Sequence, residues 1–201
     1  MKIEHETVAR WFNYVRDKSD RWFTESFWDT QLKSKKEIID NIPQHFHGNY
    51  YIFGGWYGVL AHLLDDNVAS NEIYTIDIDP KCKEIGDRYF IRPNITYITQ
   101  DMCDFDYQVN GIGPDDVVIN TSTEHLHQHK YDVWWNNIPE GAFYIVQGND
   151  LDIPDHVRSF VSLEHFIEWN RCTNVIFESG MELPGPNNTT YNRYTVMGYK
   201  G

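Results

Sequence analysis

A glycine-rich turn and two later carboxylates are the first residues in this sequence that suggest a bound nucleoside. Residues 54–58 read Gly-Gly-Trp-Tyr-Gly. Such a turn lets the backbone approach a ligand and offers free N–H groups at the start of a helix. Asp77 follows about twenty residues later, where a carboxylate can accept hydrogen bonds from both hydroxyls of a ribose. Asp101 and Met102 combine an acceptor for the exocyclic amine of adenine with an apolar group that can pack on its ring.

A second polar cluster has the side chains of a general acid or base. Residues 120–125 read Asn-Thr-Ser-Thr-Glu-His. Histidine titrates near neutral pH, so His125 is the best candidate for a general base, with Glu124 beside it. Capping or packing in a loop is the alternative role for His125. Four further residues are candidates to orient a ligand by hydrogen bonds, although ordinary loop polarity also explains them: Asn120, Thr121, Asn149 and Asp150.

The spacing of His125, His127 and His129 raises the alternative of a metal site. Alternating histidines on a strand share one face, and neutral imidazole binds zinc, nickel or iron. This segment is expected to leave a strand and enter a helix, which removes the alternation. His125 and His129 could pair across one helical turn, but the sequence indicates no third ligand. We therefore predict no metal site.

Alternating strands and helices are expected to position these residues from residue 48 onward. The strands joined through helices imply a mostly parallel sheet with helices on both faces, and ligands bind beyond the carboxyl ends of such strands. The last two strands are joined by a turn without a helix, which predicts an antiparallel edge and seven strands in all. The expected strands are 49–53, 72–76, 95–99, 116–120, 142–146, 174–178 and 191–199. The expected helices are 59–64, 80–89 after a cap at Asp79, 131–136, and a last one that Ser162 caps and that runs to about residue 170.

Residues 1–47 are predicted to form a helical extension before a single domain at 48–201. Val8, Trp11 and Val15 recur at helical spacing, and Ser34 with Glu37 forms a capping box that predicts a short helix at 35–41. The aromatic side chains of this extension could form a lid over the active site or simply pack the extra helices into the core. They are Trp11, Phe12, Trp22, Phe23, Phe27 and Trp28.

Charge and composition narrow the classes of partner. The 201 residues include 17 Lys and Arg against 30 Asp and Glu, which gives a net charge of −13. An acidic surface repels phosphate backbones and anionic lipids, so we expect neither a nucleic-acid partner nor a membrane partner. The three cysteines are far apart and show no CxxC pairing, which argues against a disulfide framework or a structural zinc site. No apolar run reaches the length of a membrane helix or signal peptide, so we expect a cytoplasmic protein.

Four segments carry a resemblance to the class I S-adenosylmethionine-dependent methyltransferases, which have a Rossmann-like fold. They are 51–58, 76–80, 99–102 and 116–120, and the Ile-Asp-Ile-Asp-Pro sequence at 76–80 is quite characteristic. The stretch 120–150 resembles small, poorly described members of this family. The resemblance implies S-adenosylmethionine as the cofactor, with its methionine part at the glycine turn, its ribose at Asp77 and its adenine at Asp101 and Met102. The implied cofactor residues are Gly54, Gly55, Trp56, Tyr57, Gly58, Asp77, Ile78, Asp101, Met102 and Asn120.

The predicted activity is methyl transfer to a small molecule or a peptide. His125 and Glu124 are the expected catalytic residues, and Thr121, Asn149 and Asp150 are expected to bind the substrate. Two departures from the family pattern keep alternatives open, because Ile52 stands where the family has an acid and Trp56 replaces the middle glycine. The alternatives are a non-catalytic protein that binds S-adenosylmethionine and another nucleotide-cofactor enzyme of the NAD type, although the loop lacks GxGxxG.

Overall fold

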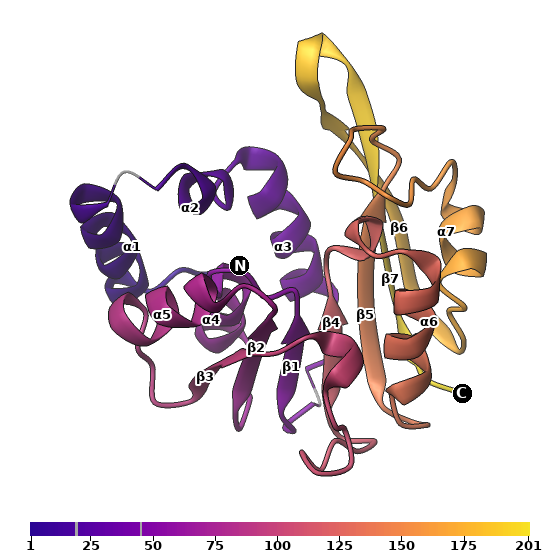
Figure 1. Cartoon of the computed structure of the whole chain (residues 1–201), viewed down its shortest axis with the longest axis horizontal. Coiled ribbons are helices and arrows are strands. Elements are labelled where there is room, and N and C mark those ends of the chain that lie inside the picture. Colours follow the sequence, from indigo (N-terminus) through magenta and orange to yellow (C-terminus); the bar gives the residue numbers. More distant parts are fainter. Residues whose placement is uncertain (19, 45) are drawn as a thin grey trace. The chain divides into compact units, whose positions relative to one another are not determined.

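The computed structural model describes residues 1–18, 20–44 and 46–201, apart from the side chain of Trp22. The chain divides into two compact units, Met1–Met102 and Cys103–Gly201, and each contains both helices and strands (Figure 1). The seven strands follow the order β3-β2-β1-β4-β5-β7-β6. The predicted α/β fold, a mostly parallel seven-stranded sheet with an antiparallel edge, is confirmed.

The first unit contains three parallel strands with helices between them. The strands β1 (Tyr50–Phe53), β2 (Ile73–Asp77) and β3 (Ile95–Thr99) pair in the order β3-β2-β1. All four residues of β1 are buried, as expected for a central parallel strand. The helix α4 (Val59–Asn67) follows β1, and α5 (Pro80–Tyr89) follows β2. The predicted start of α5 is confirmed, because the Asp79 side chain accepts a hydrogen bond from the Lys81 N–H at 2.9 Å and proline takes the first helical position.

Three helices precede this sheet: α1 (His5–Asp17), α2 (Arg21–Glu25) and α3 (Asp29–Asn41). The predicted start of the last helix at Lys35 is wrong, since α3 begins at Asp29 and Ser34 lies inside it. The Ser34 hydroxyl donates to the Gln31 carbonyl at 2.9 Å, so it bonds backward within the helix, whose N-cap residue is Trp28. The N-terminus of α2 is capped by Asp20, whose side chain accepts a hydrogen bond from the Phe23 N–H.

Aromatic side chains of these helices pack inside the first unit. Phe23 is fully buried and lies 5.2 Å from the Phe90 ring and 5.7 Å from the Tyr57 ring, centre to centre. Trp11 is also buried and contacts Phe27 edge to face at 4.7 Å. These contacts support core packing over a lid for these three side chains. Phe12 and Trp28 are exposed, and the Trp22 side chain lies outside the described residues.

The second unit contains one parallel pair and a long antiparallel hairpin. The strands β4 (Val117–Asn120) and β5 (Phe143–Asn149) are parallel, and β6 (Val175–Pro184) and β7 (Thr190–Tyr199) are antiparallel. β7 pairs antiparallel with β5, which gives the order β4-β5-β7-β6. The helices are α6 (Gln128–Asn137) and α7 (Leu163–Trp169), and Ser162 caps α7 as predicted by accepting from the His165 N–H. β6 is longer than the predicted strand, because its alternating exposed and half-buried residues continue to Pro184.

No helix in the described part of the chain is long and apolar enough to cross a membrane.

A buried histidine in α4 predicts acid sensitivity of the fold. His62 is fully buried, its Nε2 lies 3.3 Å from the Tyr97 hydroxyl, and burial together with Arg92 lowers its pKa to about 4. The unfolded chain takes up this proton near pH 6.5, while the folded chain does so only near pH 4. The free energy of unfolding should therefore be highest above pH 6.5 and fall by about 3 kcal/mol as the pH drops towards 4. Urea unfolding of His62→Leu should show a flatter dependence over this interval, and an unchanged slope would contradict the assignment.

Candidate functional site

The turn after β1 has a backbone that few side chains tolerate. Gly54 and Gly58 have φ angles of 65° and 73°, and Trp56 has a φ angle of 50°. Such left-handed conformations favour glycine, so Trp56 is held there by its surroundings. The Trp56 ring stacks on the neighbouring Tyr57 ring at 5.4 Å. The Gly58 N–H donates to the Gly55 carbonyl at 3.0 Å, which closes the turn just before α4 begins.

Asp77 joins this turn to the loop that follows β2. One carboxylate oxygen accepts from the Trp56 N–H at 2.9 Å, and the other accepts from the Asp79 N–H at 3.0 Å. The side chain is half-buried at the carboxyl end of β2. Each carboxylate oxygen has two acceptor positions, so these bonds fix the direction of the carboxylate and leave capacity for ribose hydroxyls. The structure thus brings together the glycine turn and the acid that the sequence placed about twenty residues apart.

Two glycines of the turn are required by packing inside the protein. A Cβ on Gly55 would lie 2.0 Å from the Thr75 hydroxyl oxygen, and a Cβ on Gly58 would lie 2.6 Å from the Tyr97 hydroxyl oxygen. We expected the bare backbone to make room for a ligand, whereas the atoms next to these two positions belong to β2 and β3. Substitutions at Gly55 or Gly58 would therefore disturb folding before they could report on ligand binding.

The other predicted cofactor residues occupy varied environments. Tyr57 is buried against Phe23, so its backbone is the part left to meet a ligand. Ile78 is 66% exposed beside Asp77. Asp101 and Met102 are half-buried and follow β3 after one intervening residue. Asn120, at the end of β4 in the second unit, is fully buried and its side-chain oxygen accepts from the Ser122 N–H at 3.0 Å.

Glu124 is the centre of a buried polar network in the second unit. It lies in the short 3-10 helix η2 (Thr123–His125) after β4 and is only 3% exposed. Its Oε1 accepts from the Asn149 side-chain nitrogen at 2.6 Å and from the Arg193 guanidinium at 2.7 Å. Arg193 stands opposite Asn149 in the β5–β7 register, and its guanidinium also donates to the Thr121 carbonyl. This network holds the Glu124 carboxylate in a fixed position and pairs it with Arg193.

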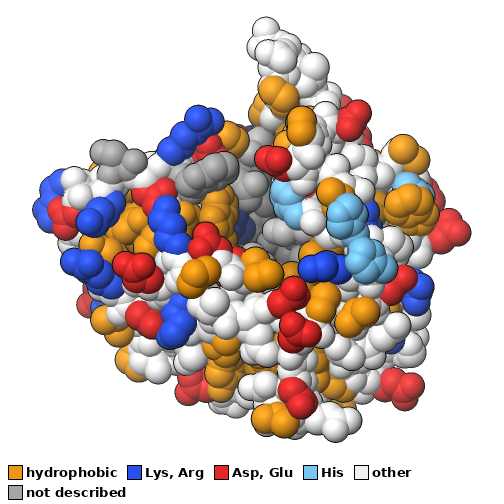
Figure 2. Space-filling model, in the orientation of Figure 1, with side chains coloured by type: hydrophobic (Ala, Val, Ile, Leu, Met, Phe, Trp, Pro, Cys, Tyr) orange, Lys and Arg blue, Asp and Glu red, His pale blue; other side chains and the backbone are white. Residues whose placement is uncertain are grey.

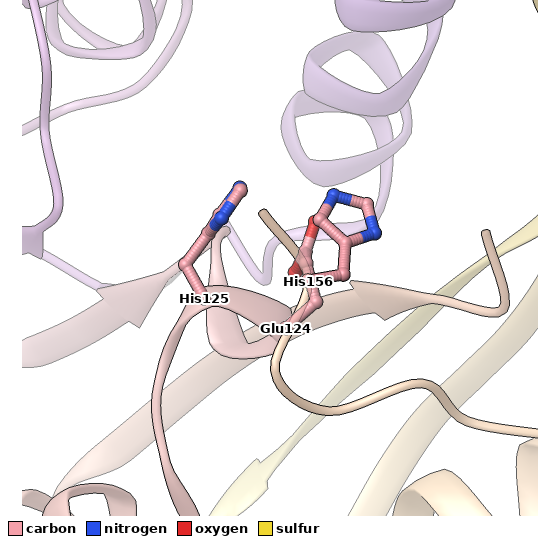
Figure 3. A group of neighbouring side chains, drawn as sticks. All are labelled: Glu124, His125 and His156. Carbon is pink, nitrogen blue, oxygen red and sulfur yellow. The ribbon is translucent and has the colours of Figure 1, made fainter. Parts of the chain in front are cut away.

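A loop after β5 brings a second histidine to this network. The N–H groups of Val157 and Arg158 both donate to the Glu124 backbone carbonyl, at 2.9 and 3.1 Å. The preceding residue, His156, therefore lies beside Glu124 and His125, with 4.9 Å between the two imidazole centres (Figure 3). Histidine side chains gather on the face of the molecule seen in Figure 2.

Both imidazoles have a defined tautomer. His125 Nδ1 lies 2.9 Å from the Asp155 carbonyl oxygen, and His156 Nδ1 lies 2.7 Å from the Leu151 carbonyl oxygen. A carbonyl only accepts, so each Nδ1 carries the proton and each neutral ring keeps a lone pair on Nε2. These lone pairs can take a proton or bind a metal.

Several candidates from the sequence lie near the network with other partners. Both carboxylate oxygens of Asp150 accept from Asn192, from its backbone and side-chain nitrogens, each at 2.7 Å. Thr121 is half-buried, and its carbonyl accepts a hydrogen bond from the Arg193 guanidinium. His127 precedes α6 and His129 lies in its first turn, so the predicted loss of alternation is confirmed, and their rings stack on each other at 5.9 Å.

Sequence reasoning missed His156 and Arg193, which lie 32 and 69 residues beyond Glu124. His156 follows the carboxyl end of β5, the edge at which ligands bind in α/β sheets, and this position could have marked it. Arg193 could be placed only by knowing that β7 pairs with β5 in a register that sets it against Asn149.

A hollow of about 530 Å³ lies elsewhere, between α1, α2 and α5 of the first unit. Basic side chains on its lining include Lys18, Arg21, Lys81 and Arg88. Lys81 is paired there with Asp20 at 2.9 Å. None of the residues predicted to bind cofactor or substrate lines it. We therefore assign no part of the predicted chemistry to this hollow.

Comparison with solved structures identifies the fold. The N-methyltransferase NodS from Bradyrhizobium japonicum, in complex with S-adenosyl-L-homocysteine, is 10% identical with a TM-score of 0.67, over 94% of this chain and 98% of that chain. A 1,6-didemethyltoxoflavin-N1-methyltransferase from Burkholderia thailandensis is 14% identical with a TM-score of 0.63, over 100% of this chain and 92% of that chain. The geranyl diphosphate C-methyltransferase from Streptomyces coelicolor is 9% identical with a TM-score of 0.61, over 85% of this chain and 76% of that chain.

No protein-family model matches the sequence, and no curated protein matches it. At sequence identities of 9–14%, these comparisons show that the chains share a fold and show nothing further about this protein. The chain has the Rossmann-like fold of class I S-adenosylmethionine-dependent methyltransferases, as the sequence resemblance predicted.

Proposed function

We propose that this protein transfers a methyl group from S-adenosylmethionine to a small molecule or a peptide. The observation that carries the proposal is the position of Asp77, which lies at the end of β2 and is bonded through Trp56 to the glycine turn after β1. A carboxylate held in this way can accept both ribose hydroxyls, while the turn and the start of α4 approach the rest of the cofactor. The solved structures of this fold that were crystallised with S-adenosylhomocysteine support the same choice of cofactor.

The remaining predicted cofactor residues complete this assignment. We assign the adenine to Asp101 and Met102 and the methionine part to the turn that Gly54 begins. Ile52 is buried in β1, where it offers no charge to the methionine amino group, so the turn backbone must supply more of the binding. The acidic surface favours a small or peptidic acceptor over a nucleic acid.

Acceptor activation is assigned to the second unit. When bound, S-adenosylmethionine supplies a methyl group whose carbon–sulfur bond breaks as the acceptor attacks, with the electron pair left on sulfur. A protonated acceptor must lose its proton, and His125 Nε2 has the lone pair to receive it, because Nδ1 is committed to the Asp155 carbonyl. Glu124 and Asn149 hold the surrounding turn, and Thr121 and Asp150 are the remaining candidates to contact the substrate.

A matched pair of neutral substitutions tests the cofactor assignment. Asp77→Asn removes the charge and one of the two oxygens proposed to accept from the ribose, whereas Asp79→Asn removes the same charge two residues away at a helix cap that asparagine also serves well. Charge-assisted hydrogen bonds contribute about 1.5–3 kcal/mol each, so Asp77→Asn should weaken S-adenosylhomocysteine binding by at least about tenfold. Asp79→Asn should bind with nearly the affinity of the original protein.

Isothermal titration calorimetry measures both affinities, and circular dichroism confirms that both variants fold. Equal affinities for Asp77→Asn and Asp79→Asn would remove Asp77 from the site. A thermal-shift panel that also includes NAD separates the other nucleotide-cofactor class, since stabilisation by NAD alone would contradict the proposed function.

A further inference from the structure

The geometry points to a binding site for a divalent transition-metal ion formed by Glu124, His125 and His156. One ligand atom from each of these residues lies within 4.8 Å of the other two (Figure 3). We predicted no metal site from the sequence because the histidines at 125, 127 and 129 had no third ligand. The structure supplies a different set, in which His156 replaces His127 and His129 and Glu124 adds a carboxylate.

The two imidazoles are prepared to bind a metal. Each donates its Nδ1 proton to a backbone carbonyl, of Asp155 and of Leu151 respectively, and so presents the Nε2 lone pair. A metal-bound histidine in proteins almost always makes such a hydrogen bond through its other nitrogen, which fixes the tautomer and the direction of the ring. These bonds are therefore the second-layer contacts that a metal site needs.

The carboxylate has one oxygen engaged and one oxygen open. Oε1 of Glu124 accepts from Asn149 and from Arg193, whereas Oε2 is buried and has no hydrogen-bond partner among the described residues. A buried carboxylate oxygen without a partner is unfavourable, and a cation next to it would satisfy it. Arg193 pairs with Oε1 and balances the charge on that side of the carboxylate, which leaves Oε2 as the ligand atom.

The backbone holds the three ligands as one unit. Glu124 and His125 are neighbours in η2, and the Glu124 carbonyl accepts from Val157 and Arg158, directly after His156. A metal bound to ligands at about 2.1 Å brings them to about 3–3.5 Å from one another, so small rotations of the side chains suffice to close the site. His125 is exposed and His156 half-buried, so packing leaves room for small rotations of both rings that keep their Nδ1 hydrogen bonds.

The donor set selects the class of ion. Two imidazoles and one carboxylate suit zinc, iron, cobalt or manganese in the divalent state, and leave coordination positions open for water or an acceptor oxygen or nitrogen. Magnesium and calcium prefer sites built mainly from oxygen, so they should bind weakly here. The site therefore takes a first-row divalent ion and presents it to an exchangeable ligand.

In the proposed function the lone pair on His125 Nε2 accepts a proton from the acceptor. At the metal site the same lone pair would bind the metal ion. A metal-bound water or acceptor group would be deprotonated through the ion, so the acceptor would be activated without His125 as the base. Metal binding itself does not depend on methyl transfer, and the titration below uses neither cofactor nor acceptor. Asp77→Asn should bind metal like the original protein, which separates failure of this inference from failure of the cofactor assignment.

Titration of the full chain with Co²⁺, followed by calorimetry and visible absorption, tests the site. We expect one Co²⁺ per chain and at least tenfold weaker binding by His125→Ala and by His156→Ala. His127→Ala and His129→Ala are the matched controls, and each should bind within about twofold of the original protein. A tenfold excess of Mg²⁺ should not displace Co²⁺.

Three outcomes would overturn the inference. The first is no Co²⁺ uptake at millimolar concentration. The second is binding that survives His156→Ala but is lost in His127→Ala or His129→Ala, which would place the ion on the α6 histidines. The third is a sulfur-to-cobalt charge-transfer band, which would place it on a cysteine.

Discussion

Replacing Glu124 by glutamine should lower the free energy of unfolding by about 3–5 kcal/mol. The substitution keeps the shape of the side chain and an oxygen that can accept from Asn149, but it removes the charge opposite Arg193. Arg193 is 6% exposed, so its guanidinium would remain buried without a counter-charge. Breaking a buried ion pair by removing one partner is among the largest effects that a single substitution produces.

Urea unfolding measures this loss, and Glu140→Gln is the matched control. Glu140 is an exposed carboxylate in the same unit, so its neutralisation should change stability by less than about 0.5 kcal/mol. Removing both charges in Glu124→Gln with Arg193→Met should recover part of the loss. A loss below about 1 kcal/mol in Glu124→Gln alone would show that the network is not the anchor described here.

His125→Ala should lower the rate of methyl transfer at least about a hundredfold while leaving the affinity for S-adenosylmethionine unchanged. The substitution removes the Nε2 lone pair that either takes the acceptor proton or binds the metal. It leaves Asp77 and the glycine turn intact, since these belong to the other unit. Release of S-adenosylhomocysteine in the presence of the methyl acceptor measures the rate, and calorimetry measures the affinity.

His127→Ala is the control for this rate. His127 is an exposed histidine two residues away, and its substitution removes a nearby imidazole without touching the Glu124 network. A variant lacking His125 that turns over as fast as the original protein would exclude both the base and the metal-ligand role in catalysis. Equal losses in both variants would instead assign the effect to the start of α6.

The elements that the sequence predicts well are those with a local cause. β3 occupies the predicted residues because its β-prone run is bounded by turn residues, and α5 begins at Asp79 and Pro80 because capping is a contact between near neighbours. The start of α3 could not be predicted in this way. Ser34 has the sequence of a cap, but the helix begins five residues earlier at Asp29, and Ser34 belongs to its buried face together with Lys35, Ile38 and Ile39.

The sequence predicts the parts of the candidate site that follow consecutive parallel strands. It does not predict the parts that come together through strand order and register. Asp77 and the glycine turn could be related because consecutive parallel strands end at the same edge of a sheet. Glu124 lies next to His125 in the sequence, yet its partners are Arg193 from β7 and a loop that returns after β5. These contacts depend on strand order and register, which no local pattern of residues determines.

The most direct test of the central claim is a calorimetric titration of this protein with S-adenosylhomocysteine. We expect binding of one molecule per chain, stabilisation of the fold by the ligand, and a loss of at least about tenfold in affinity in Asp77→Asn but not in Asp79→Asn. Absence of binding at millimolar ligand by the folded protein would contradict it, and the Rossmann-like fold would then serve a different ligand.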